Sequence, residues 1–367
     1  MENDTLFPIA DISGTPYEIG LQHGSIFKTQ IANSIETYRV MFRDYSNLEW
    51  EQGKKMAQRY IEPIRDYNPD YIEEMKGVAD GSGVSFDDIL TLNARSELVL
   101  QANSNAAPEV DGCTSIAITP DASVNGHMLA AHNWDWKDTQ RPSMVMMNIT
   151  QKNGKPTIHL ITEAGIIGKT GFNSAGISLY LNALSVDSPP NGLPIHIAMR
   201  GILDSESLSD AMTAAVRMQL GCCANFLIAH KSGEAVDIEI SNNDFDVLLP
   251  KDGIIVHTNH FLSPRLPRDP HFDTFKRKLP DSFLRQYRAE KRLAAINVPI
   301  GMEDLKSVLQ DHTGAPEAIC RHNNMKHPAG QRLCTVFSIV IDLTANEMHF
   351  CPGSPCETPY RVYRFDQ

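Results

Sequence analysis

The chain has 367 residues, of which 42% are hydrophobic and 21% charged, and this composition is typical of a folded globular protein rather than a disordered one. Its net charge of −12 argues against a general nucleic-acid binder. The acid excess is uneven, because residues 1–112 hold 9 basic and 19 acidic side chains while residues 113–367 hold 24 and 26. This asymmetry indicates two unlike segments.

The sequence also indicates where the protein works. Its seven cysteines form no CxxC pair, so free thiols in a reducing compartment are favoured over a disulfide framework. The first residues, MENDTLFPIADISGTPY, lack the basic and apolar regions of a secretory signal. No run approaches 18 apolar residues. We therefore expect a cytoplasmic protein without membrane or nucleic-acid partners.

The first hundred residues are expected to be mostly helical. Thr15-Pro16-Tyr17-Glu18 is a capping box with proline at the first helical position, and apolar residues follow at helical spacing. Residues 48–66 and 70–79 continue this pattern, and Ser85 is expected to begin another helix. The polar run QANSNAAPEVDG then ends the segment.

After this break the pattern changes to short strands with helices in blocks. Helices are expected at 195–204, 207–219, 282–295 and 303–310, and the chain is expected to close with the hairpin TVFSIVIDL and EMHFCPG. Sheets stacked between helical layers are the predicted architecture. The expected strands before that hairpin are TSIAIT, HMLAAHN, MVMMNIT, TIHLIT, GISLYLN, NFLIAH, AVDIEIS, FDVLL and GIIVHT.

Cys113 lies in VDGCTS, where the helical segment gives way to strands and the acid excess ends. A lone cysteine at such a place is most often a small core residue. The preceding Gly112 allows another role, because in a tight turn the thiol can attack the Gly112 carbonyl and shift the acyl group from nitrogen to sulfur. Hydrolysis would then free an α-amine, with a pKa of about 8, that can act as general base for its own thiol.

Two polar residues near strand ends fit this chemistry. Asp135, in NWDW, either ends a strand between packed aromatic rings or holds the α-amine of Cys113, where a carboxylate would orient the base. Asn259, in VHTNH, can donate from its side-chain amide to the oxyanion of a tetrahedral intermediate. Such a donor is typically worth about 3 kcal/mol to the transition state.

The histidines suggest two alternatives. HTNH, together with His322 and His327 in RHNNMKH, suggests zinc, but HTNH has neither an acidic partner nor a helical context, so we expect no metal there or elsewhere. Cys113 and His257 lie near papain-like spacing, without the CGSCW-type surroundings of that class.

Two further segments concern anionic ligands. Gly168-Lys169-Thr170 is not a phosphate-binding loop, because Glu163 rather than glycine stands five residues before Gly168. Residues 265–292 carry nine basic and four acidic side chains. They form either a solvated helix face or a cationic rim that steers an anionic substrate.

Six segments occur in the order found in one known family: DGCTS, NWDW, TEAGIIGKTGFNSAG, PIHIAMR, VHTNH and LPDSFLRQYR. With them the chain resembles the isopenicillin N acyltransferases (acyl-coenzyme A:6-aminopenicillanic acid acyltransferases), which belong to the self-processing N-terminal-nucleophile amidohydrolases with cysteine nucleophiles. The resemblance runs from GTPYEIG to RFD near the end, and residues 162–176 are its most specific part.

The resemblance implies an α+β fold, a four-layer αββα sandwich of the N-terminal-nucleophile hydrolase type, that cuts itself between Gly112 and Cys113. Residues 1–112 would be a mainly helical pro-segment or α subunit and residues 113–367 the catalytic β subunit, both remaining associated in one domain. The implied activity is cleavage or exchange of acyl groups in small amides or thioesters. No resident cofactor is implied, and acyl-coenzyme A is a candidate co-substrate.

The resemblance also implies roles for individual residues. Cys113 would be the nucleophile, Asp135 would bind its new amine, and Asn259 would be the oxyanion donor. Arg285, in the PDSFLR segment, would lie beside the nucleophile or a substrate carboxylate. The family's LNxRxE run is present at residues 92–97 and supports the precursor junction. The residues expected to bind substrate are Thr114, Ser115, Trp134 and Ala224.

Departures from the family concern the acceptor and the location. Ala224 stands where the family has a serine, and Cys222 and Cys223 are unfamiliar neighbours. The chain ends in RFDQ rather than in a peroxisomal tripeptide, so import by that route is not expected. These departures weaken the case for a β-lactam acceptor and leave the chemistry at Cys113 unchanged.

Three alternatives stay open. The enzyme could hydrolyse small N-acyl amines or amino acids without coenzyme A. The chain could be an uncleaved, non-enzymatic binding protein on the same scaffold. A papain-like peptidase would need no cleavage at Gly112 and would depend on His257.

Overall fold

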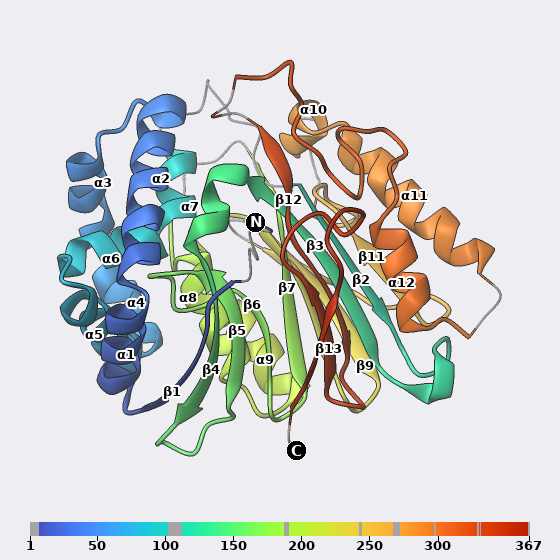
Figure 1. The fold of residues 1–367 in the computed structure, drawn as a ribbon, viewed down its shortest axis with the longest axis horizontal. Helices are drawn as coiled ribbons and strands as arrows, with labels where there is room; N and C mark the ends of the chain where they lie inside the picture. The colour runs from blue at the N-terminus through green and yellow to red at the C-terminus, as the bar shows by residue number, and fades with distance from the viewer. Residues whose placement is uncertain are drawn as a thin grey trace, which may run out of the picture.

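The computed structural model describes residues 7–101, 112–186, 191–241, 244–266, 272–296, 299–328, 330 and 332–365. Two β-sheets stack face to face, and helices cover the outer face of each (Figure 1). This is the four-layer αββα sandwich expected from the sequence, and it is confirmed. In the described part of the chain, no helix combines the length and the apolar character that crossing a bilayer requires.

The first sheet has eight strands, and all neighbouring strands are antiparallel except β1 and β4, which are parallel. β1, β6 and the short β14 of the other sheet were not predicted. In spatial order the first sheet consists of β1 (Ile9–Gly14), β4 (Met144–Gln151), β5 (Ile158–Glu163), β6 (Thr170–Asn173), β7 (Ile177–Ala183), β8 (Ala224–His230), β9 (Glu234–Ile240) and β10 (Phe245–Leu248).

The second sheet has six antiparallel strands, and the closing hairpin predicted from the sequence forms two of them. The register of β12 on β3 shifts between Thr335 and Phe337, beside Asp135. In spatial order this sheet consists of β11 (Ile254–His257), β2 (Gly112–Ile118), β3 (Leu129–Lys137), β12 (Leu333–Asp342), β13 (Glu347–Cys351) and β14 (Arg361–Arg364).

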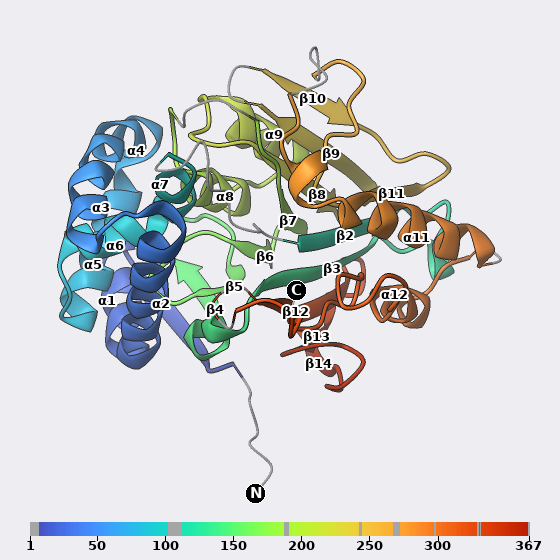
Figure 2. The ribbon, with the colours of Figure 1, turned by 90° about the horizontal axis from the view of Figure 1, so that it is seen from above.

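The N-terminal helices begin where the caps predict. Thr15 and Ser85 both form capping boxes at the starts of α1 and α6. These helices lie together beside β1, β4 and β5 (Figures 1 and 2). They are α1 (Pro16–Ile26), α2 (Lys28–Ser46), α3 (Trp50–Ala57), η1 (Gln58–Tyr60), α4 (Ile61–Tyr67), α5 (Pro69–Ser82), α6 (Phe86–Asn93) and α7 (Arg95–Gln101).

The tightest contact among these helices is between α1 and α5, and it depends on glycine. A Cβ atom at Gly20 would lie 1.9 Å from the Glu74 carbonyl oxygen, and one at Gly77 would lie 2.2 Å from that of Tyr17. Because no side chain occupies this space, the two helix backbones touch directly.

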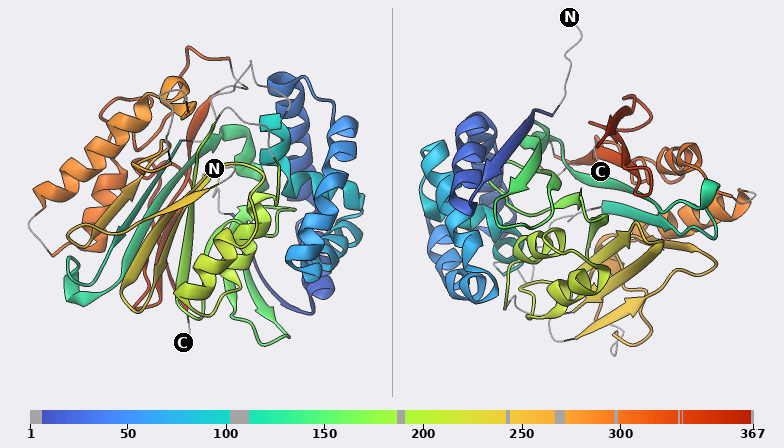
Figure 3. Two further views of the ribbon diagram at one scale, coloured as in Figure 1. Left: turned by 180° about the vertical axis from the view of Figure 1, so that it is seen from behind. Right: turned by 90° about the horizontal axis from the view of Figure 1, so that it is seen from below.

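The remaining helices cover the outer faces of the sheets. α8 and α9 pack on β6 to β9, and Figure 3 shows them in yellow-green in front of the first sheet when the molecule is seen from behind. α11 and α12 pack on β2, β3, β11 and β12 of the second sheet (Figure 2). The bounds are η2 (Val124–Gly126), η3 (Asp138–Ser143), α8 (Ile195–Leu203), α9 (Leu208–Val216), α10 (Phe275–Lys278), α11 (Asp281–Ala295) and α12 (Met302–Leu309).

One large hydrophobic core joins the N-terminal helices to both sheets. It includes side chains from α1 to α7 on one side of Gly112 and from both sheets on the other. A second, smaller core lies between the second sheet and α11 and α12. Residues before and after position 112 therefore share one continuous interior.

Candidate active site

Cys113 is the second residue of β2, and its side chain is fully buried. Side chains alternate along this strand: Cys113 and Ala117 belong to the large core between the sheets, whereas Ile116 belongs to the smaller core beneath the helices. The thiol therefore faces the interior between the two sheets.

Asn259 contacts the backbone of Cys113 directly. It follows β11, which pairs with β2. Its Oδ1 accepts hydrogen bonds from the Cys113 backbone N–H and from Arg285 Nη2, both at 2.8 Å. Its Nδ2 donates to the Ala183 carbonyl oxygen at 3.1 Å. Two donors face the oxygen and one acceptor faces the nitrogen, so the partners fix the orientation of this amide.

Arg285 reaches the same backbone from α11 and is fully buried. Its Nη1 donates to the Cys113 carbonyl oxygen at 2.6 Å and to Thr114 Oγ1 at 3.3 Å. Its Nε donates to Asp281 Oδ2 at 2.9 Å, one helical turn earlier. The guanidinium thus fixes both the strand backbone and Asn259, which requires its planar set of donors.

Asp135 lies opposite Gly112 in the pairing of β2 with β3. Its Oδ1 accepts a hydrogen bond from Thr335 Oγ1 at 2.7 Å, and its Oδ2 lies 3.3 Å from Arg321 Nε. Arg321 also donates from Nη2 to Asp281. These bonds fix a fully buried carboxylate beside the Gly112–Cys113 bond.

Asp281 connects the two arginines of the site. Burial disfavours its charge, but the guanidinium groups of Arg285 and Arg321 hold the pKa of the Asp281 carboxyl below its usual value. Asp281 is therefore ionised at neutral pH. Carboxylates and guanidiniums alternate from Asp135 through Arg321 and Asp281 to Arg285.

Gly112 lies against Arg321. A Cβ atom at position 112 would lie 2.8 Å from Arg321 Nε and 2.9 Å from Nη2, which is inside van der Waals contact. Since Asp135 and Asp281 hold the guanidinium in place, only glycine fits at position 112 without moving Arg321.

Sequence reasoning missed Arg321, Thr335 and Asp281. Asp281 had a signal, because it stands four residues before Arg285 in PDSFLR and so faces it on a helix. Arg321 and Thr335 had none, because neither lies near Cys113 in the sequence. The register of β12 brings Thr335 to the site, and the segment before β12 brings Arg321.

The four residues expected to bind substrate fall in different places. Trp134 pairs with Cys113 across β2 and β3 and is buried with it in the same core. Ser115 donates to Asn182 Oδ1 at 2.8 Å, toward the first sheet, and Ala224 is buried and pairs with Ala183. Thr114 contacts Arg285 on the opposite face of β2.

His257, the first histidine of VHTNH, has acidic neighbours that the sequence did not indicate. His257 Nε2 lies 2.8 Å from Glu239 Oε1, and its Nδ1 lies 2.8 Å from the Thr258 carbonyl oxygen. Burial opposes protonation of His257, but Asp237 and Glu239 raise its pKa above the usual value. Because both ring nitrogens are engaged, His257 is not arranged as the base of a papain-like pair.

Much of the basic segment at 265–292 is already paired. Arg288 and Arg292 of α11 both contact Asp311, at 2.6 and 3.0 Å. Lys291 is exposed on the same helix, with its Nζ 5.5 Å from the centre of the Tyr287 ring. Any steering of an anionic substrate from this helix therefore falls to Lys291 rather than to Arg288.

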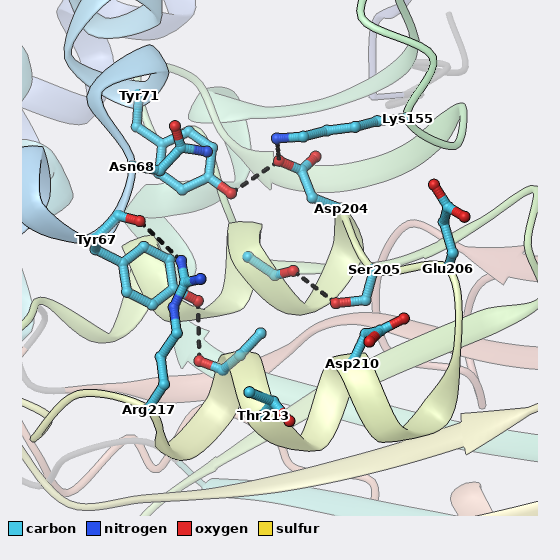
Figure 4. A pocket seen from close by; sticks show the side chains of 12 residues that line it. Tyr67, Asn68, Tyr71, Lys155, Asp204, Ser205, Glu206, Asp210, Thr213 and Arg217 are labelled. Carbon is cyan, nitrogen blue, oxygen red and sulfur yellow. Dashed lines mark hydrogen bonds and ion pairs between the residues drawn. The ribbon is translucent and has the colours of Figure 1, made fainter.

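A pocket of about 490 Å³ lies between α4, α5, α8 and α9 (Figure 4). Its polar walls include Asp204, which accepts from Lys155 and Tyr71, and Arg217, which donates to the Tyr67 carbonyl oxygen. None of its lining residues belongs to the Cys113 site.

Comparison with known proteins decides the family. The family model of acyl-coenzyme A:6-aminopenicillanic acid acyl-transferase matches residues 123–357. The acyl-coenzyme A:6-aminopenicillanic-acid-acyltransferase 40 kDa form of Emericella nidulans is 32% identical over 345 residues, which is 93% of this chain and 91% of that protein. The chain belongs to this family. The expectation of an enzyme that transfers acyl groups or hydrolyses amides is confirmed.

Two further likenesses lie beyond the acyltransferases themselves. The beta-alanyl-dopamine/carcinine hydrolase of Drosophila melanogaster is 22% identical over 375 residues, which is 96% of this chain and 94% of that protein. The structure of penicillin V acylase from Agrobacterium tumefaciens has a TM-score of 0.44 at 14% identity and covers 68% of this chain and 84% of that one. The range matched by the family model contains Asp135, Asn259 and Arg285, and it begins ten residues after Cys113.

Proposed function

We propose that the protein is a self-cleaving cysteine acyltransferase or amidohydrolase whose nucleophile is Cys113. The observation that carries this proposal is the fixation of the Gly112–Cys113 bond. Asn259 holds the Cys113 nitrogen, Arg285 holds its carbonyl oxygen, and Asp135 lies opposite Gly112 in the neighbouring strand. Such fixation orients the reacting groups before the reaction starts.

Cleavage proceeds by an acyl shift. The Cys113 sulfur attacks the Gly112 carbonyl carbon, the C–N bond breaks, and the departing nitrogen takes up a proton to become an amine. Water then hydrolyses the Gly112 thioester, which yields the Gly112 carboxylate and regenerates the thiol. The products are pieces of 112 and 255 residues.

The surrounding residues hold the new amine. Asn259 Oδ1 already accepts from the Cys113 nitrogen and keeps this contact when the amide becomes an amine. The Asp135 carboxylate, fixed by Thr335 and Arg321, supplies negative charge beside it. An amine so placed, with an unperturbed pKa of about 8, removes the proton of the thiol.

Turnover uses the same groups on an external carbonyl. The thiolate attacks an amide or thioester, and the oxyanion is stabilised by a hydrogen of Asn259 Nδ2 other than the one on Ala183, together with a backbone amide. The resulting acyl-thioester is resolved by an amine or by water. Trp134 and Ser115, on the face of β2 and β3 that carries the thiol, line the acyl site.

Acyl-coenzyme A is the proposed acyl donor, in line with the Emericella nidulans relative. The second candidate is hydrolysis without coenzyme A, because the Drosophila relative, named a hydrolase, matches over nearly its whole length. Both candidates use the same acyl-enzyme and differ in what resolves it.

We further propose that the two pieces stay together after cleavage. Asn93, before the cut, donates to the Gly165 carbonyl oxygen at 2.8 Å and accepts from the Ile167 nitrogen at 3.0 Å, after it. Arg95 likewise pairs with Glu163 in the interior. Separating the pieces would expose these groups and the shared core to water.

The test compares the wild type with Cys113→Ala and with Cys334→Ala, a matched control at a buried cysteine in the same sheet. Wild type and control should separate into two bands under denaturing conditions, co-elute as one particle under native conditions, and turn over an acyl-coenzyme A or an N-acyl amine. Cys113→Ala should stay whole and inactive. A whole wild-type chain that forms no acyl adduct would refute this proposal and support the uncleaved binding protein instead.

A further inference from the structure

Two histidines and two cysteines gather at one corner of the molecule, outside the proposed active site. His312, Cys320 and His322 lie in the segment between α12 and β12, and Cys356 lies after β13. Their ligand atoms, one from each side chain, all lie within 4.8 Å of one another. Cys320 is buried, His322 half-buried, and the other two are exposed.

Four of the six distances between ligand atoms in this cluster are close to those of a tetrahedral metal site, and the two from His312 to the sulfurs lie within 4.8 Å. Zn–S bonds of about 2.3 Å and Zn–N bonds of about 2.0 Å place two sulfurs about 3.8 Å apart, a sulfur and a nitrogen about 3.5 Å, and two nitrogens about 3.3 Å. The sulfurs of Cys320 and Cys356 are 3.5 Å apart, and His322 Nε2 lies 3.7 and 3.3 Å from them. The two histidine Nε2 atoms are 3.1 Å apart.

The ligands are also held from outside. His322 turns its other ring nitrogen, Nδ1, toward the Glu357 carboxylate at 3.6 Å, which is the usual second partner of a metal-bound histidine. The Cys320 nitrogen donates to the Asp311 carbonyl oxygen at 3.0 Å. Ser354 closes a turn through its carbonyl oxygen, which accepts from Glu357 and so presents Cys356.

We propose that His312, Cys320, His322 and Cys356 bind one Zn²⁺ in a structural site. Two thiolates and two imidazoles in a tetrahedron are a ligand set that zinc prefers. Binding releases the two thiol protons, and the two thiolate charges balance the ion. From the sequence, His322 and His327 were weighed as zinc ligands together with the histidines of HTNH, and no metal was expected. The structure instead groups His322 with His312, Cys320 and Cys356.

The position of the site suggests what the ion does. Arg321 stands between the ligands Cys320 and His322, and its side chain reaches Asp135, Asp281 and the space beside Gly112. The zinc ion therefore clamps the backbone that carries this arginine. This consequence rests on the proposed function, whereas the zinc site itself does not.

The experiment measures metal in the full chain, purified without a histidine tag and without chelator. The wild type should hold about one zinc per chain by elemental mass spectrometry, and Cys356→Ser and His312→Ala should lose most of it. Cys334→Ser, at a cysteine outside the cluster, should keep it. Cobalt added to the stripped protein should give thiolate-to-cobalt charge-transfer absorption, which Cys356→Ser should abolish.

Three results would overturn the zinc site. They are a folded wild type that neither contains nor takes up zinc, equal zinc in wild type and Cys356→Ser, and a Cys320–Cys356 disulfide, seen as a mass lower by two hydrogens. Circular dichroism of each variant checks that it has folded. If the ion positions Arg321, the stripped protein should cleave itself more slowly, and added zinc should restore the rate. Zinc binding with an unchanged cleavage rate would refute this effect on Arg321 but not the zinc site.

Discussion

The contact between Gly112 and Arg321 gives the sharpest mutational prediction. In Gly112→Ala, the added Cβ would meet Arg321 Nε at 2.8 Å, against an ordinary separation of about 3.5–4.0 Å. Gly112 is the first residue of strand β2, whose extended backbone alanine also adopts, so the contact with Arg321 is the source of strain. The guanidinium must then move by about 0.7 Å or more away from position 112, which disturbs its contacts with Asp135 and Asp281.

Two consequences follow from this displacement. Overpacking a closed site costs about 1–3 kcal/mol of folding free energy. A shift approaching 1 Å beside the reacting bond slows a positioned reaction about 100-fold. We therefore expect Gly112→Ala to accumulate uncleaved chain and to lose about 1–3 kcal/mol of stability.

The assay separates sterics from other effects of alanine. Stability is measured by urea unfolding in a Cys113→Ala background, where every chain stays whole, for Gly112→Ala, Arg321→Ala and the double variant. The control is Gly330→Ala, where an added Cβ meets nothing within 4 Å. The cost of Gly112→Ala should largely disappear when Arg321 is absent. An equal cost in both backgrounds, or in the control, would refute the contact as the reason for glycine.

Three further predictions concern the site, the core and the substrate. Arg285→Lys keeps the charge but cannot hydrogen-bond to Cys113, Asn259 and Asp281 at the same time, so self-cleavage should slow about 100-fold. The rate is followed on denaturing gels, and an unchanged rate would contradict the positioning role of Arg285. Burial lowers the pKa of His23 to about 3, so unfolded chains bind the extra proton below pH ~6.5 and stability falls as pH decreases. His23→Gln, whose amide can still accept from Gly165, should reduce the slope of the unfolding free energy against pH by up to about 1.4 kcal/mol per pH unit in denaturant titrations. An identical slope in wild type and variant would exclude His23 as the source of the pH dependence. Lys291→Glu should raise the Michaelis constant for acyl-coenzyme A several-fold but not that for an uncharged N-acyl amide, and equal effects on both would argue against a cationic rim.

Local signals predicted the elements, and the short motifs predicted part of the site. Capping boxes at Thr15 and Ser85 are sequence-local, and both helices begin where they indicate. The segments VHTNH and PDSFLR carry Asn259 and Arg285, and both side chains contact the Cys113 backbone. Their meeting depends on β11 pairing with β2 and on α11 packing against both strands. The resemblance implied the roles of the two residues, and neither it nor the residue pattern predicted this pairing.

What could not be predicted depends on long-range register. Asp135 lies opposite Gly112 only because β2 and β3 pair in one register. Thr335, which donates to Asp135, lies in the neighbouring strand β12, where the register shifts. Strand β1 was missed because IADISG alternates weakly. Its partner β4 runs parallel to it, and Ile9 of β1 pairs with Met146 of β4, far away in the sequence. The cluster proposed to bind zinc was not grouped from the sequence because Cys356 comes from a separate loop.

Cys113 becomes an N-terminal nucleophile in the proposed function, and mass spectrometry of the larger fragment tests this most directly. We predict that the fragment begins at Cys113 and gains one acyl group on its first residue when incubated with an acyl-coenzyme A or N-acyl substrate. A single species of 40.8 kDa, or a fragment beginning at any other residue, would contradict it.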